Sequence, residues 1–239
     1  MEINTRILQH HHEETLLEGY FAVPAAPTEP LPAILIAPAW AGCNEQAKER
    51  AEILAGLGYP AFAIDLYGNG RTGKTREECA TLMGEISKDR AFLLERLKAC
   101  LETLQSQPEV KESRIAALGY CFGGLCVLDM ARGELDIRGA ISFHGIFNPP
   151  QRLLNTPIEA RILVLHGFDD PMATPEDAIN LGKELTARKA DWQIHFYGST
   201  THAFTNPDAN DPDFGTVYNP KSNERSWSLA QDFLREVLK

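Results

Sequence analysis

The sequence predicts an α/β protein with a mostly parallel central sheet, helices on both faces, and antiparallel strands at the N-terminus. Segments with strand character alternate along the chain with segments whose apolar residues recur at helical spacing. Several of the strand segments are apolar throughout, which is typical of a parallel sheet covered on both faces. Two short strand segments come first with no helix between them, so we expect them to pair as an antiparallel extension.

The N-terminal half contains most of the expected strands. In chain order they are 5–9, 16–24, 33–40, 59–68 and 113–120. Apolar residues at helical spacing predict a helix over 44–57, which ends at Gly58. The segment 71–86 is polar at first and then amphipathic, and a longer helix is expected to run on to about Gln105. Pro108 then falls in the turn beyond it.

Three consecutive histidines, His10 to His12, lie between the first two expected strands. We expect them to form a solvated turn. Weak metal affinity and a tag remnant are the alternatives that the sequence leaves open.

The C-terminal half continues the alternation. A strand is expected over 137–145, and the segments 160–171 and 191–204 are each expected to be a strand followed by a loop. The expected helices are 122–132, 174–190 and 222–239. Thr174 is the expected N-cap of its helix, with Pro175 at the first helical position. Ser222 or Asn223 is the expected cap of the last helix. No internal repeat or low-complexity linker interrupts the chain, so we expect one domain over 1–239.

The composition restricts the kind of partner and the compartment. The formal net charge of −10 disfavours nucleic acids and membranes, because their phosphate groups attract Lys and Arg. We find no secretory signal and no apolar run of membrane-spanning length. Five cysteines without a C-x-x-C pair predict free thiols in the cytoplasm rather than disulfides or structural zinc. A small-molecule substrate is expected, for a protein that is a monomer or a homodimer.

The stretch G-x-C-x-G-G at 119–124 predicts a reactive thiol at Cys121. A tight turn from strand to helix forces its middle residue into strained backbone angles, and it needs glycine two positions before and after. The turn also places Cys121 at a helix N-terminus, where backbone N–H groups favour a thiolate. The alternative is a buried core thiol beside chance glycines. A base and an acid farther along the chain would favour the interpretation of Cys121 as a nucleophile over that of a core thiol.

Asp170 and His202 are the candidates for that acid and base. Both follow expected parallel strands, so they lie at the edge of the sheet where α/β proteins build their sites. The order Cys121, Asp170, His202 is that of nucleophile, acid and histidine in α/β-hydrolases. Asp169 is the direct competitor of Asp170. Of the other histidines, His144 also ends a strand and is a candidate for the pocket wall, whereas His166 and His195 are expected to be structural.

Six short stretches, in order and over most of the chain, resemble the dienelactone hydrolase family. They are APAWAG, AIDLYG, LGYCFGG, SFHG, LHGFDDP and THAF. The resemblance implies an α/β-hydrolase fold and a Cys-His-Asp triad that needs no metal or organic cofactor. It makes Cys121 the nucleophile, His202 the base and Asp170 its partner. The backbone N–H groups of Phe122 and Trp40 are then expected to form the oxyanion hole.

Two departures from the family pattern bear on the substrate. The loop position of the family's activating glutamate is Ala39 here, and the position of an arginine that holds the substrate carboxylate is Asn206. Both changes argue against a lactone that carries a carboxylate. The expected pocket is instead neutral and aromatic. Its candidate wall residues are Ala39, Trp40, Tyr67, His144 and Phe204, with Tyr120 as a further possibility.

The resemblance implies hydrolysis of activated esters or lactones through a thioester on Cys121. The first alternative is the same site acting on aryl phosphotriesters. The second is of another class, a thiol redox sensor or a binding protein on a hydrolase scaffold, because an activated thiol is oxidisable. Cys126 lies on another face of the expected helix, so no resolving cysteine is evident. The loop 68–75 either gates the pocket or is simply mobile, and it lacks the glycine count of a phosphate loop.

Overall fold

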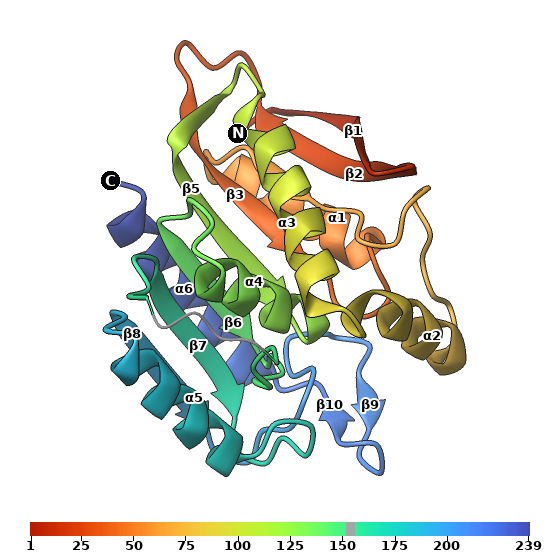
Figure 1. Ribbon diagram of the computed structural model, residues 1–239, viewed down its shortest axis with the longest axis vertical. Coiled ribbons are helices and arrows are strands. Elements are labelled where there is room, and N and C mark those ends of the chain that lie inside the picture. The colour runs from red at the N-terminus through yellow and green to blue at the C-terminus, as the bar shows by residue number, and fades with distance from the viewer. Residues whose placement is uncertain (152–155) are drawn as a thin grey trace.

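Eight strands form one sheet in the order β1-β2-β4-β3-β5-β6-β7-β8, and the computed structural model describes residues 1–151 and 156–239 (Figure 1). The strands are β1 (Ile3–His12), β2 (Thr15–Pro24), β3 (Leu31–Ala37), β4 (Ala61–Ala63), β5 (Val110–Tyr120), β6 (Gly139–Phe143), β7 (Arg161–Gly167) and β8 (Trp192–Tyr197). The strand β2 pairs antiparallel with β1 and β4, and all other pairs are parallel. The predicted fold class is confirmed.

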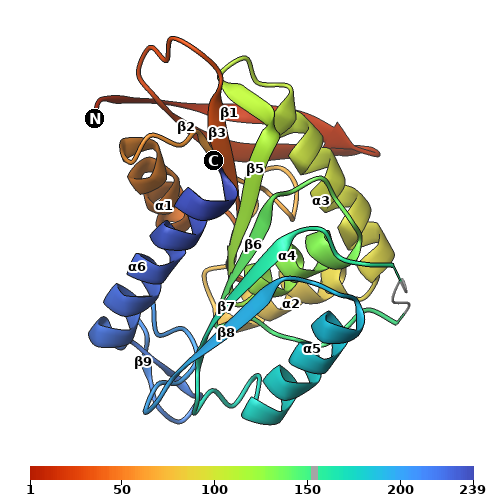
Figure 2. The same cartoon turned by 90° about the vertical axis from the view of Figure 1, so that its left-hand side faces the viewer.

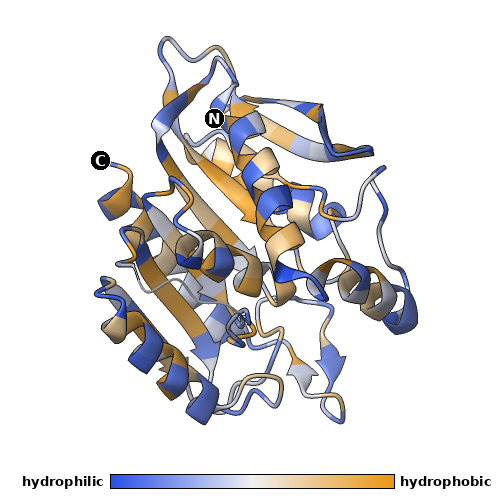
Figure 3. Ribbon diagram, in the orientation of Figure 1, coloured by the Kyte–Doolittle hydropathy of each residue, from blue (hydrophilic) through white to orange (hydrophobic). Residues whose placement is uncertain are grey.

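Helices cover both faces of this sheet (Figure 2). One face carries α1 (Glu45–Gly56) and α6 (Pro220–Val237), and the other carries α3 (Arg90–Gln105), α4 (Phe122–Arg132) and α5 (Pro175–Ala187). A further helix, α2 (Arg76–Ser87), packs beside α3. The central strands are apolar along most of their length (Figure 3), since their side chains are buried on both faces.

Two predicted elements are shorter or broken, and a polar side chain explains each difference. The strand expected over 59–68 stops at Ala63, because the Asp65 carboxylate accepts backbone N–H groups of the following loop, including that of Tyr67 at 2.9 Å. The long helix is divided between α2 and α3. Asp89 accepts the N–H groups of Ala91 and Phe92 and so begins a new helix.

Two further expectations are corrected. His10 to His12 belong to β1 rather than to a solvated turn, and the His12 ring accepts a hydrogen bond from Arg96 at 3.3 Å. The last helix begins at Pro220 and is capped by Asn219 rather than by Ser222 or Asn223. A proline is favourable at the first helical position, where its missing N–H leaves no acceptor unpaired. The expected cap at Thr174 is confirmed.

The carboxyl ends of β3, β5, β6 and β7 meet at one edge of the sheet, at the bottom of Figure 1. The two-stranded ribbon of β9 (Asn210–Asp211) and β10 (Thr216–Val217) lies beside this edge. Parallel strands place their following loops on the same side, so this edge collects side chains from distant parts of the chain. In the described ranges, no helix combines the length and the apolar character needed to cross a bilayer.

Candidate active site

Cys121 occupies the turn between β5 and α4, where its backbone adopts φ 54° and ψ −116°. A positive φ is uncommon for a residue with a side chain and costs free energy. Neighbouring bonds hold it in place, since the Cys121 N–H donates to the Phe143 carbonyl at 3.0 Å and its own carbonyl accepts from Gly124 at 2.9 Å. The turn therefore presents the Cys121 thiol at the N-terminus of α4, before any substrate arrives.

The flanking glycines allow the close packing that this turn requires. A Cβ atom added at Gly119 would overlap the carbonyl oxygen of Gly123. A Cβ atom added at Gly123 would overlap the carbonyl oxygen of Ala37, at the end of β3. The obstacles are backbone atoms and cannot rotate away, so both positions require glycine.

We predict that Gly123→Ala lowers the free energy of unfolding by about 3 kcal/mol, because backbone must move to admit the methyl group. The matched control is Gly84→Ala in α2, where no atom lies within 4 Å of the added Cβ. Alanine is the better helix former, so this control gains up to about 1 kcal/mol. Urea denaturation of both variants measures the difference. Equal stability of the two variants would contradict the close packing of the elbow.

His202 and Asp170 lie together on the loops that follow β8 and β7. The His202 Nδ1–H donates to Asp170 Oδ2 at 2.8 Å, and both side chains are almost completely buried. The other Asp170 oxygen accepts the backbone N–H groups of Met172 at 2.8 Å and Ala173 at 3.4 Å. These bonds orient the carboxylate, whereas Asp169 is exposed. The structure thus pairs His202 with Asp170 and leaves Asp169 outside the site.

The charge of His202 depends on its two acidic neighbours. Burial by itself lowers the pKa of His202, but the electrostatic effect of Cys121 and the hydrogen bond that His202 donates to Asp170 outweigh it and raise the pKa to about 10. The imidazole Nε2 is buried and has no hydrogen-bond partner in the described part of the chain. His202 therefore holds a proton in the folded protein, and its Nε2 faces no competing partner in the described ranges.

We predict that His202 gives the protein a stability that declines in alkali. A folded-state pKa near 10 against 6.5 for an unperturbed histidine means that the protonated ring stabilises the folded state. This contribution is complete below about pH 6.5 and is lost as the pH rises through about 10. The measurement is the free energy of unfolding of wild type minus that of His202→Gln, from pH 6 to 10. A difference that grows with pH would contradict the assigned charge.

Two backbone N–H groups are available as oxyanion donors. Phe122 is the first residue of α4, so its N–H has no partner within the helix. Trp40 follows β3, and in the described ranges neither its N–H nor that of Phe122 donates to another group. The Tyr67 hydroxyl donates to the Trp40 carbonyl at 2.7 Å and so holds this peptide in place. Trp40 lines the same cavity as Cys121, and Phe122 directly follows Cys121 in the chain.

A cavity of about 710 Å³ opens in front of these groups, and its wall includes Ala39, Trp40, Cys121, His144 and His202. Phe214 also lines it, on the loop between β9 and β10, with its ring stacked on Trp40 at a centroid distance of 6.0 Å. The ribbon thus covers one side of the site. The loop 68–75 does not contribute to the wall.

Three expectations about the pocket are wrong. Tyr67 is buried behind the wall, where it supports the Trp40 peptide. Phe204 is also buried behind the wall, since its ring packs edge-on against His144 at 5.2 Å. The cavity is not purely neutral, because Glu49 and Arg50 of α1 line it. No motif in the sequence marks these two charged residues, which the packing of α1 brings to the site.

His144 lines the cavity as a neutral imidazole. Its ring meets the His202 ring edge-on at 5.0 Å, and its Nε2 forms a hydrogen bond of 2.8 Å with Thr205 Oγ1. Burial holds the pKa of His144 well below 6.5, and the neighbouring His202 lowers it further. His144 therefore adds no positive charge beside His202. Across residues 1–151 and 156–239, no three side chains of His, Cys, Asp or Glu are grouped to hold a metal ion.

Comparisons with known proteins identify the family of this chain. Residues 17–238 match the sequence model of the dienelactone hydrolase family. An uncharacterized protein of Caenorhabditis elegans is 37% identical over 148 residues, which cover 59% of this chain and 92% of that protein. The solved structure of m3DLH has a TM-score of 0.92 at 33% identity and covers 99% of both chains. A dienelactone hydrolase-like promiscuous phosphotriesterase from metagenomic libraries has the same TM-score and coverage at 30% identity. With the match spanning nearly the whole sequence, this chain belongs to the dienelactone hydrolase family, whose members are hydrolases of lactones and esters.

Proposed function

We propose that the protein hydrolyses activated carboxylic esters or lactones with Cys121 as nucleophile, His202 as base and Asp170 as the residue that orients the base. The observation that carries this proposal is the strained Cys121 elbow facing the same cavity as the His202–Asp170 pair, which is joined by a 2.8 Å hydrogen bond. A strained nucleophile beside a buried, oriented imidazole is the arrangement that covalent acyl transfer requires.

In this mechanism His202 already holds the proton of the Cys121 thiol before the substrate binds, since its pKa is raised to about 10. The thiolate attacks the substrate carbonyl carbon, and the N–H groups of Trp40 and Phe122 bind the resulting oxyanion, each contributing about 3 kcal/mol to transition-state stability. The C–O bond of the ester then breaks, and the leaving alkoxide or enolate takes the proton from His202. Water, deprotonated by His202, attacks the thioester, and the carboxylic acid departs as the thiolate re-forms.

The chemistry of sulfur narrows the substrate class. A thiolate leaves a tetrahedral intermediate more readily than an alkoxide does, so attack by Cys121 is productive when the other leaving group is also good. Enol and phenol esters meet this condition, and amides do not. The aromatic rings of Trp40 and Phe214 at the cavity wall provide apolar contacts for such a leaving group.

The experiment is a rapid-mixing assay with 4-nitrophenyl acetate, followed by acid quenching and mass spectrometry of the intact and digested protein. We expect a burst of one equivalent of nitrophenolate and an acetyl group on the peptide that contains Cys121. The same assay on an enol-lactone establishes whether lactones are turned over faster. If neither the burst nor the Cys121 adduct is observed, the covalent mechanism is refuted.

Aryl phosphotriesters are the second candidate substrates, because the phosphotriesterase from metagenomic libraries is 30% identical over 99% of this chain. The thiolate would attack phosphorus and release the aryl oxide, leaving a phosphorylated Cys121. Diethyl 4-nitrophenyl phosphate tests this candidate. Steady turnover after the first equivalent favours a phosphotriesterase activity, whereas a single burst without turnover identifies the compound as an inhibitor.

A further inference from the structure

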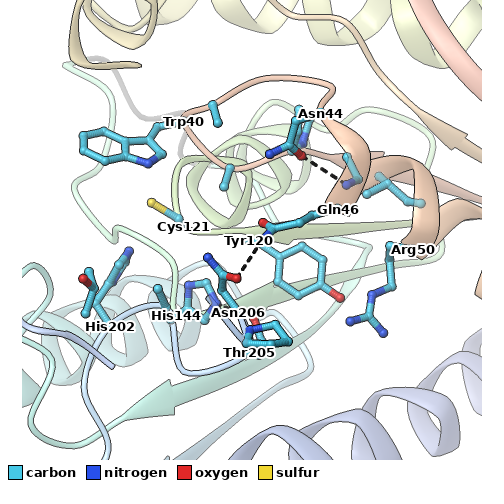
Figure 4. A pocket seen from close by; sticks show the side chains of 18 of the residues that line it. Trp40, Asn44, Gln46, Arg50, Tyr120, Cys121, His144, His202, Thr205 and Asn206 are labelled. Carbon is cyan, nitrogen blue, oxygen red and sulfur yellow. Dashed lines mark hydrogen bonds between the residues drawn. The ribbon is translucent and has the colours of Figure 1, made fainter. Parts of the chain in front are cut away.

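A second buried histidine lies next to the acid of the candidate triad. Figure 4 shows Cys121 and His202 on the same side of the pocket, and Asp170 meets His202 from behind the cavity wall. His166 belongs to β7, four residues before Asp170, and the side chains of both are completely buried. The proposed acyl transfer gives no part to His166, so a polar ring at this place needs a separate explanation.

One hydrogen bond fixes the His166 ring and its proton. The ring Nε2 lies 2.7 Å from the carbonyl oxygen of Ala173. A carbonyl oxygen can only accept, so the proton of the neutral ring is on Nε2. The other nitrogen, Nδ1, is buried and has no hydrogen-bond partner in the described ranges. Burial lowers the pKa of His166 and so keeps the ring neutral, because a second proton on Nδ1 would be a buried donor without an acceptor.

This bond closes the turn that carries Asp170. Asp170 Oδ1 accepts the backbone N–H groups of Met172 and Ala173, at 2.8 Å and 3.4 Å. The carboxylate is thereby tied to its own turn, and His166 ties the end of that turn to β7. Met172, between the two tied residues, lines the cavity. The position of the triad acid and of one wall residue therefore depends on the bond from His166.

The same N–H group also lies close to the Asp170 carboxylate. His166 Nε2 is 3.7 Å from Asp170 Oδ2, the oxygen that accepts the His202 Nδ1–H at 2.8 Å. This separation is longer than a hydrogen bond, but screening is weak inside a protein, so the N–H dipole still favours negative charge on that oxygen. Asp170 thus lies between two imidazoles, one that it orients and one that helps to hold it.

Apolar packing does not account for a histidine at this position. The His166 ring meets the Phe147 ring at a centroid distance of 4.6 Å and the Phe196 ring at 6.2 Å. A phenylalanine would make the same kind of contacts without burying two ring nitrogens, which is costly where one of them is unpaired. What distinguishes the histidine from a phenylalanine is the donor that it aims at Ala173 and Asp170.

We propose that His166 is a positioning residue for the triad acid: it fixes the turn 170–173 and so holds the Asp170 carboxylate in line with His202 Nδ1. His166 does not line the cavity, so it acts on the reaction only through Asp170. This inference rests on the proposed function, because the position of Asp170 affects the rate only if His202 is the base. The dependence of the Asp170–His202 bond on His166 is testable without any catalysis.

The test replaces His166 in two ways. His166→Phe keeps an aromatic ring beside Phe147 but leaves the Ala173 carbonyl without its donor, whereas His166→Gln keeps a side-chain N–H donor. We expect His166→Phe to lower kcat for 4-nitrophenyl acetate by about 10- to 100-fold, the range for a displaced catalytic group. His166→Gln restores the donor and is expected to stay within about threefold of wild type. If His166→Phe does not fold, His166→Met takes its place, since a flexible thioether fills irregular space and has no donor.

His195→Phe is the matched control, because it makes the same substitution in the neighbouring strand β8. His195 does not line the cavity, and its ring bonds in the described ranges only to Gln193, at 3.4 Å. We expect this variant to keep kcat within about twofold of wild type, as is usual away from a site. Equal losses in His195→Phe and His166→Phe would overturn the positioning role, and so would wild-type kcat in His166→Phe.

A nuclear magnetic resonance titration of the resting protein separates this proposal from the proposed catalytic mechanism. The readout is the pKa of His202, which its hydrogen bond to Asp170 helps to raise to about 10. We expect His202 to bind its proton about tenfold more weakly in His166→Phe, and as in wild type in His166→Gln. That result supports the positioning role even if Cys121→Ala keeps its esterase activity, which would refute only the mechanism. An unchanged His202 titration in His166→Phe overturns the positioning role even if Cys121 proves to be the nucleophile.

Discussion

Cys121→Ala is expected to lower kcat/KM for 4-nitrophenyl acetate by at least about 10⁴-fold, the largest effect of any single substitution in this protein. In the proposed mechanism no other group can form the covalent intermediate, since the other four cysteines are all buried. The oxyanion donors and the cavity remain in the variant, so a small residual rate above that of water is expected. Steady-state and burst kinetics measure the loss together.

The size of this effect follows from the geometry of the elbow. The turn holds the Cys121 backbone at φ 54° through hydrogen bonds of its own main chain, not of the thiol. Removing the sulfur therefore leaves the turn in place, and the variant loses chemistry rather than structure. Circular dichroism and a thermal melt close to those of the wild type are expected for Cys121→Ala.

Cys79→Ala is the control for this substitution, because Cys79 lies in α2 and does not line the cavity. Its esterase activity is expected to stay within about twofold of wild type, as is usual for substitutions away from a site. The covalent mechanism is refuted if Cys121→Ala retains most of its activity, or if Cys79→Ala loses activity while remaining folded.

Asp170→Asn is expected to reduce kcat by about 10³- to 10⁴-fold, the second largest effect. The carboxylate accepts the proton of His202 Nδ1 at 2.8 Å and so leaves Nε2 free to take the thiol proton. An asparagine can present its NH₂ group to Nδ1, which favours the opposite tautomer and places the ring proton on Nε2. The base is then blocked although the site keeps its shape.

Asp169→Asn offers a control of identical chemistry one residue away. Asp169 is exposed, and its carboxylate makes no hydrogen bond with a described residue, so we expect wild-type kcat within about twofold. Loss of activity in Asp169→Asn together with retention in Asp170→Asn would reverse the assignment of the acid. The two variants are measured at one pH, with 4-nitrophenyl acetate, in the same buffer.

The features that the sequence alone predicted are those with local causes. The buried face of each strand or helix determines where its apolar residues fall in the sequence. Strands and helices can therefore be predicted from the spacing of apolar residues. The elbow is local only in part, because Gly119 is required by the Gly123 carbonyl in the same turn, whereas Gly123 is required by the Ala37 carbonyl of β3. The helix cap at Thr174 is encoded in the same way, by a side chain that bonds to its own helix.

In two places the side chain of an aspartate shortened or divided an element that the pattern of apolar residues had predicted to continue. The amphipathic pattern before Gln105 continues through 88–89, yet the side chain of Asp89 caps a new helix and interrupts the first one. The strand after Tyr59 is cut short because Asp65 binds the backbone of the loop that follows. In both cases a carboxylate competed successfully for backbone N–H groups that an uninterrupted element would have used.

The tertiary structure alone decided the shape and charge of the pocket. Phe204 lies two residues after His202 and Tyr67 lies near the end of a predicted strand, but both pack behind the wall, whereas Phe214 reaches Trp40 from a distant loop. Arg50 lines the cavity with its guanidinium against the rings of Tyr120 and Trp227, which belong to remote segments of the chain, β5 and α6. Local periodicity determines which side chains are buried, but which of them face the same cavity depends on the packing of remote elements, and no single segment contains that information.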